Sequence, residues 1–135
     1  MSRSGYSYDL DDLELGRWRG QVASAIRGKR GQQMLRDLID ALDAMPDKSL
    51  ITNELEEEGE VCALGALGKV RGIDMGKIDP EDPAQVADAF NIAPQLAQEV
   101  VFENDEGGWQ ETPEQRWQRM RKWAASNLLP PKPTP

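Results

Sequence analysis

The strongest constraint on the fold is the spacing of the apolar residues between positions 31 and 45. They recur every three or four positions, as they do along one side of an α-helix: Met34, Leu35, Leu38, Ile39, Leu42 and Met45. Pro46 ends this pattern, because proline cannot continue a helix. We therefore predict an amphipathic helix over 31–45 that buries its apolar side against other elements.

Further helices are predicted on both sides of this segment. A first helix begins near Asp11 or Asp12 and ends at the glycines at 28 and 31; its apolar stripe is Leu15, Trp18, Val22 and Ile26. Later helices are predicted over 61–71, from Pro83 to Phe90, from Pro94 to a break at 103–108, and from Pro113 onward. Asp82 and Thr112 each precede a proline, the usual order at a helix start. The expected fold is mainly α, a compact bundle of about five or six helices.

A short β-hairpin is predicted between the second and third helices. Residues 50–52 are expected to pair with residues 60–62 around a turn at Glu58-Gly59. Gly65, Gly68 and Gly72 follow at helical spacing. Glycines are costly inside a helix unless another backbone comes close, so tight packing is favoured over a surface for ligand approach.

The length of 135 residues fits one domain. We divide the chain into a polar arm at 1–10, a single α-helical domain at 11–129 and a proline-rich tail at 130–135. No apolar run is long enough to cross a membrane, and the first residues carry no apolar signal segment. The lone Cys62 fits a reducing compartment. We therefore expect a cytoplasmic protein with no membrane contact.

The chain contains no histidine. This excludes Ser–His and Cys–His nucleophile pairs, histidine-ligated zinc and the most common general base near neutral pH. One cysteine cannot form a thiolate metal cluster. These absences favour a binding protein over an enzyme without deciding between them, and we predict no catalytic residues, no metal site and no cofactor.

Charge is unevenly distributed along a chain whose formal net charge is −8. An acidic binding face for a partner with a basic surface is predicted from seven residues: Asp37, Asp40, Asp43, Glu54, Glu56, Glu57 and Glu58. Five basic residues form the less favoured candidate, a nucleic-acid contact: Arg17, Arg19, Arg27, Lys29 and Arg30. The net charge opposes attraction to phosphates. Pairing of the acidic and basic segments with each other is the third interpretation.

A second kind of site is the alternative: a small-molecule or catalytic pocket at Cys62, Gly65, Asn104 and Asp105. A thiol at a helix start has its thiolate stabilised by the helix dipole. However, the upstream glutamates oppose this effect, and free cysteines are commonly buried and inert. Asn104 and Asp105 are also typical of a helix end, where they bond nearby backbone amides.

Several strings resemble a loosely defined family of small uncharacterised proteins of bacteria, phages and prophages. They are K-x-L…G-x-V-C-A-L-G-A-L, A-x-A-F-x-I-A, the N-D pair at Asn104-Asp105, and T-P-E-x-R-W from Thr112. The run RWRG…SAIRGKRGQ resembles the phage-encoded branch. The resemblance covers roughly residues 17–127, and C-A-L-G-A at 62–66 is its most specific string. It implies a compact α-rich fold and a phage context, but no activity.

These observations lead to three functional hypotheses. The first is a phage or prophage accessory protein that binds a host protein with a basic surface and inhibits a host or defence component through the acidic face. The second is the pocket at Cys62 and Asn104-Asp105. The third is a structural component of a virion. For the first hypothesis, the expected location is the cytoplasm of the host cell.

Overall fold

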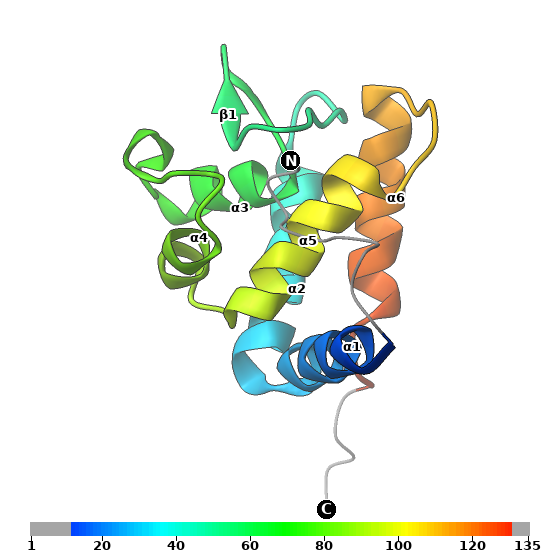
Figure 1. Cartoon of the computed structure of the whole chain (residues 1–135). Helices are drawn as coiled ribbons and strands as arrows, with labels where there is room; N and C mark the ends of the chain where they lie inside the picture. Colours follow the sequence, from blue (N-terminus) through cyan, green and yellow to red (C-terminus); the bar gives the residue numbers. More distant parts are fainter. Residues whose placement is uncertain (1–11, 131–135) are drawn as a thin grey trace, which may run out of the picture.

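The computed structural model describes residues 12–130. In this part of the chain six α-helices and a two-stranded antiparallel hairpin form a mainly α bundle, as predicted (Figure 1). The elements are α1 (Asp12–Arg27), α2 (Lys29–Ala44), β1 (Glu56–Glu57), β2 (Glu60–Val61), α3 (Ala63–Arg71), the 3₁₀ turn η1 (Met75–Lys77), α4 (Pro83–Phe90), α5 (Pro94–Glu106) and α6 (Pro113–Ser126).

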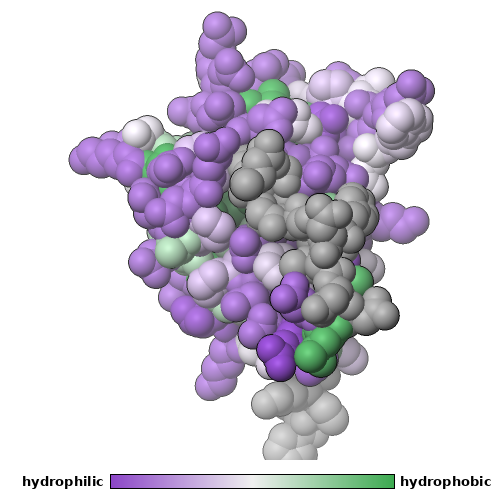
Figure 2. All heavy atoms as spheres, viewed as in Figure 1, coloured by the Kyte–Doolittle hydropathy of each residue, from purple (hydrophilic) through white to green (hydrophobic). Residues whose placement is uncertain are grey.

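Two central helices organise the bundle. α2 contacts α1, α3 and α6, while α5 contacts α1, α3, α4 and α6. The predicted apolar stripe of α2 supplies the centre of the core, where Met34, Leu35, Leu38 and Leu42 are fully buried. The hairpin projects from one end of the molecule, above α3 (Figure 1). Hydrophilic residues cover most of the face seen in Figure 2.

Capping side chains explain where three of the helices begin. Asp82 accepts hydrogen bonds from the Ala84 and Gln85 amides, and Pro83 follows it at the first position of α4. Thr112 and Gln115 form a capping box at the start of α6, in which each side chain bonds the other residue's backbone N–H. At the start of α3, Cys62 Sγ accepts a hydrogen bond from the Gly65 N–H at 3.4 Å.

The hairpin forms at the predicted turn but with a different first strand. Glu56 pairs with Val61 and Glu57 with Glu60, whereas residues 50–52 form no strand. Glu58 and Gly59 both have positive φ, 52° and 83°. A two-residue loop of this kind requires the immediately flanking residues to pair, which fixes the register. Of the predicted pairing, the structure keeps one backbone hydrogen bond, from the Ile51 N–H to the Val61 carbonyl at 2.9 Å.

Other predicted details also differ in the structure. α2 starts at Lys29, two residues earlier than predicted, and α3 starts at Ala63 because Val61 belongs to β2. α5 continues through the predicted break to Glu106. Val70, near the end of α3, is 61% exposed. No helix in the described range is long and apolar enough to span a membrane.

Candidate functional site

The hairpin turn concentrates carboxylates at one end of the molecule. Glu56, Glu57, Glu58 and Glu60 are all exposed. Glu56 forms an ion pair with Lys69 of α3 at 3.4 Å. Glu57, Glu58 and Glu60 form no ion pair with any residue in the range 12–130. This turn therefore presents three uncompensated negative charges to solvent.

Two features of this turn work against its stability. Glu57 and Glu60 lie directly opposite each other across the strands, and like charges in that position destabilise a hairpin. Glu58 adopts a left-handed conformation, φ 52°, which asparagine or glycine tolerates much better than glutamate does. The sequence thus places carboxylates at the Glu57–Glu60 pair and at Glu58, where other residues would make the hairpin more stable.

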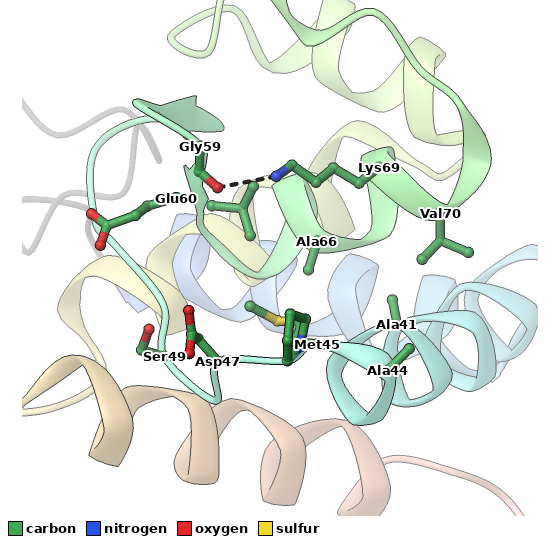
Figure 3. Close-up of a pocket in the computed structure, with 12 residues that line it drawn as sticks. Ala41, Ala44, Met45, Asp47, Ser49, Gly59, Glu60, Ala66, Lys69 and Val70 are labelled. Atoms are coloured by element: carbon green, nitrogen blue, oxygen red, sulfur yellow. Dashed lines mark hydrogen bonds between the residues drawn. The ribbon is translucent and has the colours of Figure 1, made fainter.

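A cleft of about 260 Å³ lies between α2, α3 and the hairpin (Figure 3). Its lining includes small and aliphatic side chains from the two helices, among them Ala41, Ala44, Ala66 and Val70. Ala41 and Ala66 are buried, whereas Val70 is largely exposed. The small side chains leave an apolar hollow where larger residues would close the gap between α2 and α3.

Charged residues occupy one end of this cleft. Figure 3 shows Asp47 and Glu60 on the side opposite Val70 and Ala44. Lys69 extends over the cleft, where its Nζ donates to the Gly59 carbonyl at 3.0 Å and pairs with Glu56. Lys48 does not line the cleft: its Nζ donates to the Asp43 and Met45 carbonyls at the end of α2 and lies over the Trp117 ring. The free charges of the cleft are therefore negative.

The aspartates predicted for the acidic face lie on α2, and two of the three are paired within the chain. Asp37 accepts from Arg71 of α3 at 2.9 Å, and Asp43 makes a two-bond contact with Arg121 of α6. The hydrogen bond from Arg121 lowers the pKa of Asp43. Asp40 is exposed on α2, and Glu54 is exposed just before the hairpin. On α2, therefore, Asp37 and Asp43 are compensated by arginines, whereas most of the carboxylates at the hairpin are not.

The predicted pocket residues lie close together in space, but their side chains form hydrogen bonds to backbone amides and carbonyls. Buried Asn104 of α5 accepts from the Ala63 N–H at 3.0 Å and donates to the Ile51 carbonyl at 2.9 Å. Its neighbour Asp105 accepts from the Asn53 N–H and from Asn104. Cys62 is 1% exposed. This clasp ties α5 to the start of α3 and to the segment before the hairpin, and none of these residues lines the cleft in Figure 3.

Gly65 marks a close backbone approach at the same place. A Cβ atom on Gly65 would lie 1.9 Å from the Leu55 carbonyl oxygen, far inside van der Waals contact. The Cys62 N–H donates to that same carbonyl at 3.2 Å. The geometry supports the packing interpretation of this glycine.

The predicted basic segment lies along α1 and the start of α2. Arg19 pairs with buried Glu99 of α5 at 3.2 Å, and Arg30 donates to Asn91 at 3.4 Å. Arg17, Arg27 and Lys29 are exposed. Arg19 therefore pairs with an acidic residue of another helix, as the pairing interpretation predicts, whereas Arg30 contacts a neutral side chain.

A second cleft, of about 500 Å³, lies between α1, α5 and the end of α6. Glu99 and Glu103 line it, one helical turn apart. The second carboxylate oxygen of Glu99 is buried without a hydrogen-bond donor. Burial, together with the charge of Glu99, raises the pKa of Glu103, although Arg119 lies 3.5 Å away. Within residues 12–130, no group of three or more His, Cys, Asp or Glu side chains is placed to hold a metal ion.

The sequence prediction missed several residues of the hairpin end. Helical periodicity does not reveal a gap between two helices, so the cleft residues Ala41, Ala44, Lys69 and Val70 were not among the predicted site residues. Trp109, which the sequence analysis did not single out, lies on the loop between α5 and α6 and is 88% exposed. Trp109 lies between Gly108 and Gln110, outside any apolar stripe with helical spacing, and this position was the sequence signal that it is exposed.

Comparison with protein-family models, with curated proteins and with solved structures finds no match to this chain.

Proposed function

We propose that this chain acts by binding a protein with a basic surface, through the carboxylates of the hairpin turn. In the phage or prophage setting that the resemblance implies, it is an accessory protein and its partner is a host or defence component. The binding residues are Glu57, Glu58 and Glu60, with Glu54 and Glu56 beside them.

One observation carries the proposal: the hairpin keeps carboxylates where they cost stability. Glu57 faces Glu60 across the strands, and Glu58 occupies a left-handed turn position. Natural sequences depart from the locally favourable residue mainly at functional sites. Because the described part of the chain provides no cation for these three side chains, a cation on a partner is the natural complement.

Binding is favoured over catalysis by the state of the polar groups in the alternative pocket. Cys62 Sγ, Asn104 and Asp105 are already engaged in hydrogen bonds to backbone amides and carbonyls. A nucleophile or general base must instead reach a substrate. The pocket at these residues and the virion role remain predictions.

The test is capture of partners from host-cell lysate by the tagged chain, at low and high salt. The key variant is Glu57→Gln/Glu60→Gln, which removes two charges and keeps the side-chain size. Glu81→Gln/Asp88→Asn, at exposed positions before and on α4, removes the same number of charges and is the matched control. We expect a partner that is lost with the hairpin variant and at high salt, and retained by the control. Equal capture by all three proteins would refute the hairpin as the binding surface.

A further inference from the structure

We infer that the cleft between α2, α3 and the hairpin is a socket for one aliphatic side chain of a partner's lysine- or arginine-containing segment. This inference rests on the proposed function and specifies it. The hairpin carboxylates would attract the segment, and the cleft would select for an apolar residue within it.

The size of the cleft argues for a single side chain. Its volume, about 260 Å³, is below the range of about 300–1,000 Å³ typical of pockets that enclose whole small molecules. Ala41, Ala44 and Ala66 form an apolar floor and wall, and the exposed Val70 extends the apolar surface to the rim. A leucine or methionine placed there would cover Val70 and remove this surface from water.

The charges around the cleft argue for a basic segment on either side of that apolar residue. Asp47 and Glu60 stand at one end, and neither forms an ion pair within residues 12–130. Lys69, the cation lining the cleft, is already bonded to the Gly59 carbonyl and paired with Glu56. A partner lysine next to the inserted side chain would therefore meet unpaired carboxylates.

The acidic charge around the cleft also argues against a second copy of this chain as the partner that fills it. Its net charge is −8, and the surface around the cleft is itself acidic. Like charges placed together at an interface oppose association.

The experiment is a titration of the ¹⁵N-labelled chain, followed by amide chemical shifts, with defined peptides. The probe is acetyl-GKKLKKG-amide; one comparison peptide replaces leucine with glycine, and another replaces the four lysines with glutamates. We expect shifts at Gly59, Ala66 and Val70 with the probe. Affinity should fall at least about tenfold with the glycine peptide, as expected for loss of one buried leucine. The glutamate peptide should not bind.

Two variants separate the socket from the charged turn. Ala44→Phe fills the cleft from an exposed position at the end of α2, and Ala125→Phe makes the same change at an exposed position on α6. Only Ala44→Phe should lower the affinity for the probe. Val70→Thr, which keeps the side-chain shape, provides a second test if Ala44→Phe alters the fold.

Equal affinity for the leucine and glycine peptides would overturn the socket, while salt-sensitive binding of both would leave the hairpin proposal standing. Binding of neither peptide would also overturn the socket. Shifts of the cleft amides with protein concentration alone would identify a second copy as the occupant, again contradicting the inference.

Discussion

At several positions of this chain, the local backbone geometry determines which residue type is most stable. Gly65 is required because the Leu55 carbonyl occupies the position of its missing Cβ. Glycine at 59 suits φ 83°, whereas glutamate at 58 does not suit φ 52°. Gly65 and Gly59 therefore contribute to the stability of the fold, whereas Glu58 opposes it.

Gly65→Ala should destabilise the fold by a few kcal/mol, because the added methyl group overpacks a rigid backbone contact. The control is Gly20→Ala in α1, where a Cβ meets nothing within 4 Å. That change should stabilise the helix by about 0.5–1 kcal/mol. Urea denaturation of the two variants measures both effects, and a neutral Gly65→Ala would contradict the packing role.

Glu58→Asn should raise the free energy of unfolding by about 0.5–1 kcal/mol, since asparagine tolerates the left-handed conformation. Glu54→Asn makes the same charge change at an exposed position without positive φ, and it should have little effect. Comparison of urea midpoints at constant slope distinguishes them. Equal shifts for both variants would mean that charge, not conformation, governs the turn.

At the scale of elements, α5 combines a structural clasp with a strained carboxylate pair. Asn104 near its end joins the start of α3 to the segment before the hairpin. Glu103, directly before Asn104, and Glu99, one turn before Glu103, line the same cleft. The clasp explains why α5 continues through the break that the glycines at 107 and 108 suggested.

Glu103→Gln should stabilise the protein at pH 7 by about 0.5–1 kcal/mol. The amide removes a like-charge contact one turn apart and can donate to the unpaired oxygen of Glu99. In the native chain the raised pKa of Glu103 means that the folded state binds this proton more readily than the unfolded state. The carboxylate therefore costs stability above the raised pKa, and the cost disappears as the pH falls toward 4.5, the ordinary value.

Denaturation of Glu103→Gln and wild type across pH 4 to 8 checks this prediction, with Asp88→Asn as the exposed control. The advantage of the glutamine variant should grow with pH. A constant difference at every pH would rule out titration of Glu103 as its cause.

The sequence predicted the helices well because their signals are local. The spacing of Met34, Leu38 and Leu42 and the cap-then-proline pairs Asp82-Pro83 and Thr112-Pro113 are read without knowledge of distant contacts. The hairpin register depended on backbone angles at Glu58 and Gly59. The cleft depended on how far apart α2 and α3 pack, which the sequence of neither helix contains.

At the scale of the whole molecule, part of the charge segregation seen in the sequence is resolved by ion pairs between separate elements. Asp43 pairs with Arg121, Glu99 with Arg19, and Glu111 with Arg116 and Arg119. The hydrogen bond from Arg119 lowers the pKa of Glu111. At the hairpin end, Glu57, Glu58 and Glu60 stay without an ion pair within residues 12–130, and they lie beside an apolar cleft.

The central claim is that the hairpin carboxylates reduce stability and serve binding. Glu57→Lys, compared with Glu81→Lys at an exposed position outside the helices, tests both parts in one protein. Urea denaturation should show a gain of about 0.2–1 kcal/mol, because lysine replaces a like charge opposite Glu60. Binding of the same variant to acetyl-GKKLKKG-amide should weaken at least severalfold, while the control keeps wild-type affinity. An unchanged stability together with unchanged binding would contradict the account.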